Sequence, residues 1–200
     1  MKTHCETTNR PLLNARAILT SLFILSLPIV ASAQNTYVAQ PAAGQPMPHG
    51  FFGGSNAASH VYLSVDGKPA LVLSIPGVVK VLSTNGFVRI QATNLTLYVW
   101  AVPDAKKVDD ALPRAAEIIK SEFLKFKTNM VMDMTIAGAP AKHVTGSGNE
   151  ADDGDPGNAE VVFFVVGGRV FAGCVHGEAD DASKARAAMM AVLNTAQTPP

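Results

Sequence analysis

The side chains best suited to catalysis or metal binding are those of a cysteine and a histidine two positions apart, Cys174 and His176. They lie in an apolar run typical of a β-strand, so both side chains are expected on one face. His143 is expected on a neighbouring strand, and a thiol beside an imidazole can form a nucleophile pair or part of a metal site. However, Val, Phe and Ala surround Cys174, and apolar surroundings disfavour the thiolate. We therefore interpret Cys174 as a buried structural cysteine and keep a small thiol-dependent hydrolase that uses Cys174, His176 and His143 as the alternative.

A second candidate site is a group of carboxylates in the polar stretch at residues 146–158. Dense carboxylates can bind Ca²⁺, and the candidate ligands here are Glu150, Asp152, Asp153 and Asp155. Their spacing does not match that of the EF-hand loop. We interpret the stretch as a solvated loop and keep a Ca²⁺-responsive binding module as a further alternative.

Known catalytic and cofactor-binding motifs are missing from the sequence. Nothing matches G-x-S-x-G, a P-loop, H-E-x-x-H or a dinucleotide-binding fingerprint. We therefore predict no catalytic residues and no cofactor, and a protein that is not an enzyme.

The most strand-like segment of the chain is residues 160–176, EVVFFVVGGRVFAGCVH. Two apolar runs joined by Gly167-Gly168 predict a hairpin with a two-residue turn, with Val166 opposite Arg169 and Phe164 opposite Phe171. Both faces of this hairpin are mostly apolar, whereas a strand buried on one face alternates with polar residues. The hairpin is therefore expected in the middle of a sheet that is covered on both sides.

The other elements follow from local patterns. Five short strands are predicted at 60–65, 69–75, 78–83, 87–93 and 95–102, with turn residues between them. An apolar stripe predicts a helix over 109–126, and a last helix is expected from Asp180 or Ser183 to about Asn194. Residues 130–137 read as a strand whose three methionines are interpreted as core fillers.

The first 33 residues have the features of a secretory signal peptide. A basic start, an apolar stretch at 17–30 and the small residues Ala31-Ser32-Ala33 predict cleavage before Gln34, and a membrane anchor is the alternative. The mature chain is then expected in the periplasm or outside the cell, without a transmembrane segment. We predict a flexible linker at 34–59, one domain at 60–195 and a frayed tail at 196–200.

Charge and cysteine content limit the possible partners. Removing residues 1–33 takes away three basic residues and Glu6, which leaves thirteen basic and fifteen acidic residues and a net charge of −2. That balance argues against a nucleic-acid partner or a membrane surface, since both require a basic patch. Only Cys174 remains, so no intramolecular disulfide is possible.

The order of these elements resembles the PsbP-like family across about residues 70–195. The features that carry the resemblance are the IPG at 75–77, the helix that ends at Phe126, the IAGAPA turn at 136–141 and VVFFVVGGRVFAG at 161–173. The resemblance implies an α+β fold in which helices flank both faces of an antiparallel β-sheet, an α-β-α sandwich, and a non-catalytic role. The prediction is thus an exported binding or assembly-support module of the bacterial envelope, whose partner is an unknown envelope protein or small ligand.

Overall fold

The structure is a computed structural model that describes residues 47–53, 58–84 and 87–200. These residues all belong to one compact unit, residues 33–200. The predicted signal peptide at 1–33 and the start of the predicted linker lie outside the described residues.

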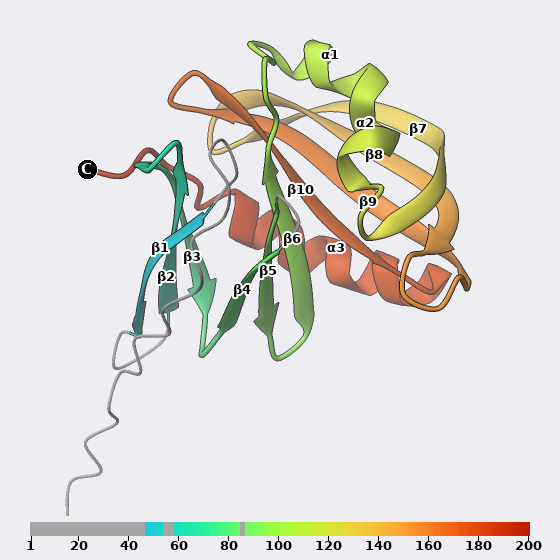
Figure 1. Cartoon of the computed structure of the whole chain (residues 1–200), viewed down its shortest axis with the longest axis horizontal. Helices are drawn as coiled ribbons and strands as arrows, with labels where there is room; N and C mark the ends of the chain where they lie inside the picture. Colours follow the sequence, from blue (N-terminus) through green and yellow to red (C-terminus); the bar gives the residue numbers. More distant parts are fainter. Residues whose placement is uncertain (1–46, 54–57, 85–86) are drawn as a thin grey trace, which may run out of the picture. The chain divides into compact units, whose positions relative to one another are not determined.

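The described chain is built mainly from antiparallel β-strands (Figure 1). The larger sheet has seven strands in the order β4-β5-β6-β10-β9-β8-β7. In chain order these strands are β4 (Lys80–Thr84), β5 (Phe87–Ala92), β6 (Leu95–Ala101), β7 (Phe123–Ile136), β8 (Ala139–Glu150), β9 (Pro156–Val166) and β10 (Arg169–Gly177).

A second sheet of three strands precedes it in the chain. Its strands are β1 (Met47–Gly53), β2 (Ala58–Val65) and β3 (Lys68–Pro76), in the order β1-β2-β3. The turn between β2 and β3 uses Asp66 and Gly67, which both have positive φ angles, 54° and 74°. Strand β1 lies within the range 34–59 that was expected to be a linker, so regular structure begins before residue 60.

The hairpin β9–β10 occupies the position predicted for it. Val166 pairs with Arg169 and Phe164 with Phe171, as expected. Gly167 and Gly168 form the turn with φ angles of 56° and 74°, a left-handed conformation that favours glycine. Strand β10 lies between β9 and β6, and β9 lies between β10 and β8. The hairpin is therefore central in the sheet and buried on both faces.

Two hydrophobic cores lie on the two faces of the seven-stranded sheet. One core joins α3 (Ala179–Leu193) and the three-stranded sheet to one face, through residues that include Leu73, Phe164 and Leu193. The other core lies under a short helical segment, through residues that include Trp100, Ile119 and Phe163. Figure 1 shows α3 and the short helical segment as the main helical elements beside the strands.

The predicted fold class, an α-β-α sandwich with helices flanking both faces, is wrong. Strands dominate the chain, and α3 shares its face of the sheet with the second sheet rather than forming a helical layer. On the other face the helical segment is short and broken into α1 (Val108–Ala111), a 3₁₀ turn η1 (Leu112–Arg114) and α2 (Ala115–Ile119). The prediction of the last helix is confirmed: α3 begins one residue before Asp180, the earlier of the two predicted starts, and ends one residue before Asn194.

The predicted helix over 109–126 ends early, and its last turns belong to strand β7. Phe123 and Phe126 are buried because the pairing of β7 with β8 shifts between Leu124 and Lys127, which places both rings on one face. The rings lie against Gly146 and Gly148, where a side chain would overlap them. A spacing of three residues fits a helix or a bulged strand equally well, and only the glycines on β8 decide between them.

Candidate functional site

The structure separates Cys174 from His143, one of the two histidines of the predicted thiol site, whereas His176 stays on the face of Cys174. Cys174 pairs with Val161 and His143 with Val162, and neighbouring residues of one strand point to opposite faces. His143 therefore faces α3, whereas Cys174 faces the short helical segment. Cys174 is fully buried, and this burial raises the pKa of its thiol. The interpretation of Cys174 as a buried cysteine is confirmed, and the structure does not bring it together with His143.

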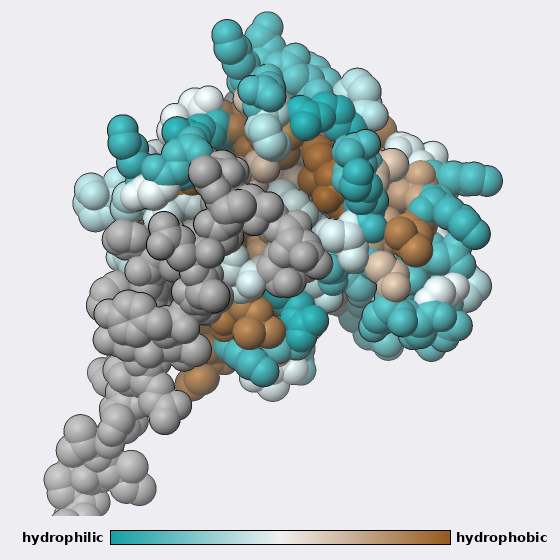
Figure 2. Space-filling view, viewed as in Figure 1, coloured by the Kyte–Doolittle hydropathy of each residue, from teal (hydrophilic) through white to brown (hydrophobic). Residues whose placement is uncertain are grey.

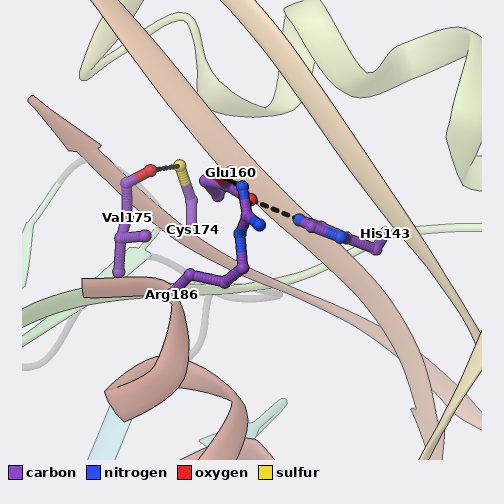
Figure 3. Close-up of polar contacts among 5 residues, drawn as sticks. All are labelled: His143, Glu160, Cys174, Val175 and Arg186. Carbon is purple, nitrogen blue, oxygen red and sulfur yellow. Dashed lines mark hydrogen bonds and ion pairs between the residues drawn. The ribbon is translucent and has the colours of Figure 1, made fainter. Parts of the chain in front are cut away.

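His143 instead belongs to a buried polar cluster on the α3 face (Figure 3). Its Nε2 lies 2.5 Å from Oε2 of Glu160, and Arg186 on α3 donates from Nε to the same oxygen over 2.9 Å. Arg186 also donates from Nη2 to Oε1 of Glu160. Burial raises the pKa of Glu160, but the hydrogen bonds from His143 and Arg186 outweigh burial and hold this pKa below its ordinary value.

This cluster ties β8, β9 and α3 together. The side chains of His143 and Glu160 are only 4% and 6% exposed, whereas that of Arg186 is 43% exposed. Because both oxygens of the buried Glu160 carboxylate are hydrogen-bonded to His143 or Arg186, we interpret the cluster as structural and not as a free acid or base. Glu160 was not predicted as a site residue, although it shares a face with Val162, two residues further along the same strand.

Three of the four predicted Ca²⁺ ligands come together where β8 ends: Glu150 is the last residue of β8, and Asp152 and Asp153 lie in the loop that leads to β9. Carboxylate oxygens of Glu150, Asp152 and Asp153 all lie within 4.8 Å of one another. Asp155 is not in this group, and its backbone N–H donates to Oδ1 of Asp153 over 2.9 Å. The cluster includes one partly buried member, Glu150, and two exposed ones. The structure thus gathers most of the predicted acidic set.

His176 lies beside this acidic cluster, a neighbour that was not predicted from the sequence. Its Nδ1 is 3.7 Å from Oε2 of Glu150, and its side chain is 9% exposed. Both ring nitrogens are buried without a hydrogen-bond partner, and the ring stacks on Tyr98 at a centroid distance of 4.9 Å. Burial lowers the pKa of His176, which favours the neutral imidazole. The register that sets His176 opposite Ala159, near the start of β9, places it next to the loop.

The carboxylates of this cluster repel one another. Burial raises the pKa of Glu150, and the negative charges of Asp152 and Asp153 raise it further. A bound cation would relieve this repulsion.

A groove lies near the same end of the sheet, at its outer strands. It has a volume of about 520 Å³ and is lined by Lys125, Lys127, Ser147, Gly148, Asn149, Pro156, Gly157 and Asn158. Lys127 pairs with Ser147, which pairs with Asn158, so these three side chains share the face of His143 and Glu160. Glu150 pairs with Phe123 and faces the other side. Lys127 and Glu150 therefore lie on opposite faces of the sheet.

Strand β7 is the outer strand at this edge and exposes apolar side chains. Met130, Val131 and Met132 are 46%, 45% and 37% exposed. The interpretation of the methionines as core fillers is therefore wrong for Met130 and Met132. Strand β7 is the last strand of the sheet and has no strand on its outer side within the described ranges. Figure 2 shows apolar surface interrupted by hydrophilic side chains on the face of the molecule that it presents.

The comparisons with known proteins establish no family. No protein-family model matches the sequence, and no curated protein matches it. A crystal structure of a protein of unknown function from Pseudomonas aeruginosa is similar at 14% sequence identity and a TM-score of 0.40, over 72% of this chain and 91% of that chain. This similarity is too low to carry an argument about fold or function. Within the described ranges, no helix has the length and apolarity needed to cross a bilayer.

Proposed function

We propose that this chain is an exported, non-catalytic binding module of the bacterial envelope, and that a partner protein binds along strand β7. The observation that carries the proposal is the exposed apolar edge formed by Met130, Val131 and Met132. The export part rests on the signal-peptide features of residues 1–33.

An exposed strand edge offers unpaired backbone N–H and C=O groups to another chain. Proteins usually protect such edges with charges, proline, bulges or short strands. Here β7 is 14 residues long, and both of its register shifts lie before Met130. From Met130 to Ile136 it pairs regularly with β8 on its inner side. The second half of β7 is thus suited to the addition of an extended segment.

The side chains along this edge indicate what kind of segment fits. Met130 and Met132 point to one face of the sheet, and Val131 points to the other. Methionine adapts to irregular apolar surfaces and is common at adaptable binding sites. We therefore infer an extended partner segment that contributes apolar side chains on both faces of the added strand.

The buried state of Cys174 supports the non-catalytic part of the proposal. A thiol that is fully buried and has a raised pKa is a poor nucleophile, and His143 lies on the opposite face. His143 is in addition held by Glu160.

Site-specific crosslinking tests the proposal. A photoreactive amino acid at position 132 should crosslink the protein to a discrete envelope partner, and Met130→Lys should abolish that crosslink because a charge protects the edge. Val78→Lys is the matched control, because Val78 is apolar, 85% exposed and outside β7. A crosslink that survives Met130→Lys would contradict the proposal, and a crosslinked homodimer would show that a second copy binds the edge.

A Ca²⁺-responsive module is the second candidate function. Three carboxylates converge, and the buried, unpartnered ring of His176 lies next to them. Millimolar Ca²⁺ should then raise the melting temperature of the protein, and Asp152→Asn should remove the rise. The exposed residue Asp180 provides the matched control, Asp180→Asn. An unchanged melting temperature, or a rise that persists in Asp152→Asn, would reject this function.

A further inference from the structure

We propose that the groove lined by Lys125 and Lys127 binds the oxyanion of a small, hydroxylated ligand, such as a phosphorylated or carboxylated sugar. This site is separate from the outer edge of β7, and the proposal does not depend on partner binding there.

The described lining of the groove carries two cationic side chains and no anionic one. None of its described lining residues carries a carboxylate, and neither lysine forms an ion pair with a described residue. The nearest acidic group along β8, Glu150, faces the other side of the sheet with Phe123. The two lysines of the lining favour an anion in the groove, since an ammonium is a compact charge with three donors.

The backbone of β7 is arranged to present these lysines. Lys125 has a φ angle of 52°, a left-handed conformation that is costly for a residue with a side chain. It lies at the register shift between Leu124 and Lys127, and a bulge of this kind redirects side chains. Without the shift, Lys127 would lie on the face of Phe123, four residues earlier; the shift turns Lys127 to the face of Ser147 and Asn158.

Buried rings hold this bulge in place from the opposite face. Phe123 and Phe126, on either side of Lys125, are 0% and 8% exposed and pack over Gly148 and Gly146. A Cβ atom on Gly148 would lie 2.7 Å from the ring of Phe123, so these glycines are needed for the rings to approach. The groove is therefore formed before a ligand arrives, which reduces the entropic cost of binding.

The remaining lining groups indicate what carries the oxyanion. Ser147 and Asn158 offer a hydroxyl and an amide, and neither side chain hydrogen-bonds to a described residue. Such groups pair with ligand hydroxyls, whereas the lysines pair with the anion. A volume of about 520 Å³ is within the usual range for small-molecule sites and exceeds the space that one free ion fills. These features favour an anionic sugar over inorganic phosphate.

Titration calorimetry with glucose 6-phosphate, glucuronate, inorganic phosphate and neutral glucose tests the proposal on the purified protein. At least one of the two anionic sugars should bind saturably and more tightly than inorganic phosphate, and its binding should weaken as NaCl increases. Glucose should not bind measurably. Amide resonances of residues 147–149 and 156–158 should shift on titration, which locates the ligand in the groove.

Charge variants provide the decisive comparison. The double variant Lys125→Gln with Lys127→Gln should weaken binding at least tenfold, and Lys127→Gln alone should weaken it several-fold without touching the strained residue. The matched control is Lys68→Gln with Lys80→Gln, which makes the same change in net charge at two exposed lysines outside the groove. No saturable binding of either anionic sugar, equal binding of glucose, or equal losses in both double variants would overturn the proposal.

Discussion

Substitution of the buried carboxylate Glu160 tests the polar cluster that ties α3 to the sheet. Glu160→Gln keeps the size of the side chain and removes its charge. Three donors then lose a charged acceptor, namely Nε2 of His143 and both nitrogens of Arg186. Hydrogen bonds to charged groups contribute about 1.5–3 kcal/mol each, and breaking a buried ion pair costs about 3–5 kcal/mol.

The exposure of the two partners decides how much of that cost is paid. Arg186 is 43% exposed and can return to water, whereas His143 is 4% exposed and cannot. We therefore expect Glu160→Gln to lower the free energy of unfolding by about 2–3 kcal/mol, below the full cost of a broken buried pair. For a chain of this size that loss corresponds to a melting temperature roughly 5–10 °C lower.

The effect should depend on pH in a defined direction. Because the pKa of Glu160 is lower in the folded protein than its ordinary value, the unfolded chain binds more protons as the pH falls. The stabilisation from Glu160 is thus complete above the unfolded pKa of about 4.3 and is lost as the pH falls through the lower, folded pKa. The difference between wild type and Glu160→Gln should therefore shrink at acidic pH.

Urea unfolding followed by circular dichroism at pH 7 and pH 3 measures this difference. Glu117→Gln is the control, because the side chain of Glu117 is 67% exposed and pairs with Lys120 at the surface, so the unfolding midpoint of this variant should stay unchanged. A loss below about 1 kcal/mol at pH 7, or an equal loss at both pH values, would refute the reasoning from burial.

Two further predictions concern the packing on the other face of the sheet. Cys174 should stay unlabelled by thiol reagents in the folded protein and react once urea unfolds it, because it is fully buried; labelling under native conditions at the rate of a free thiol would contradict its place in the core. Gly148→Ala should destabilise the protein by about 1–3 kcal/mol, because its new Cβ would overlap the carbonyl oxygen of Leu124 and lie 2.7 Å from the ring of Phe123. Thermal unfolding beside the neighbouring variant Ser147→Ala checks this, and equal stability of the two variants would argue against the close packing of the ring.

Features with a strong local signal could be predicted from the sequence. Gly167-Gly168 between two apolar runs predicted the hairpin and its register, because a two-residue turn determines which residues pair. The absence of polar residues on either face predicted the central position of the hairpin, and with it the burial of Cys174. The last helix was equally visible from its apolar spacing.

Features that depend on distant strands could not be predicted. Phe123 and Phe126 have helical spacing, and Gly146 and Gly148 on the next strand turn that segment into a bulged strand. The prediction of helices flanking both faces was wrong for the same reason, since the helical segment ends at Ile119. Because residues up to 126 were predicted to be helical, the groove lined by Lys125 and Lys127 on β7 could not be predicted either.

For the polar side chains too, some positions follow from the local sequence and others only from the tertiary structure. The sequence alone determined that Glu150, Asp152 and Asp153 lie close together in one polar stretch, and that Cys174 and His176 share a face, because strand side chains alternate. Only the tertiary structure decided that His143 pairs with Glu160 and Arg186 rather than with Cys174. Alternation along one strand is a local property, whereas the register between strands and the packing of α3 depend on contacts between residues far apart in the chain.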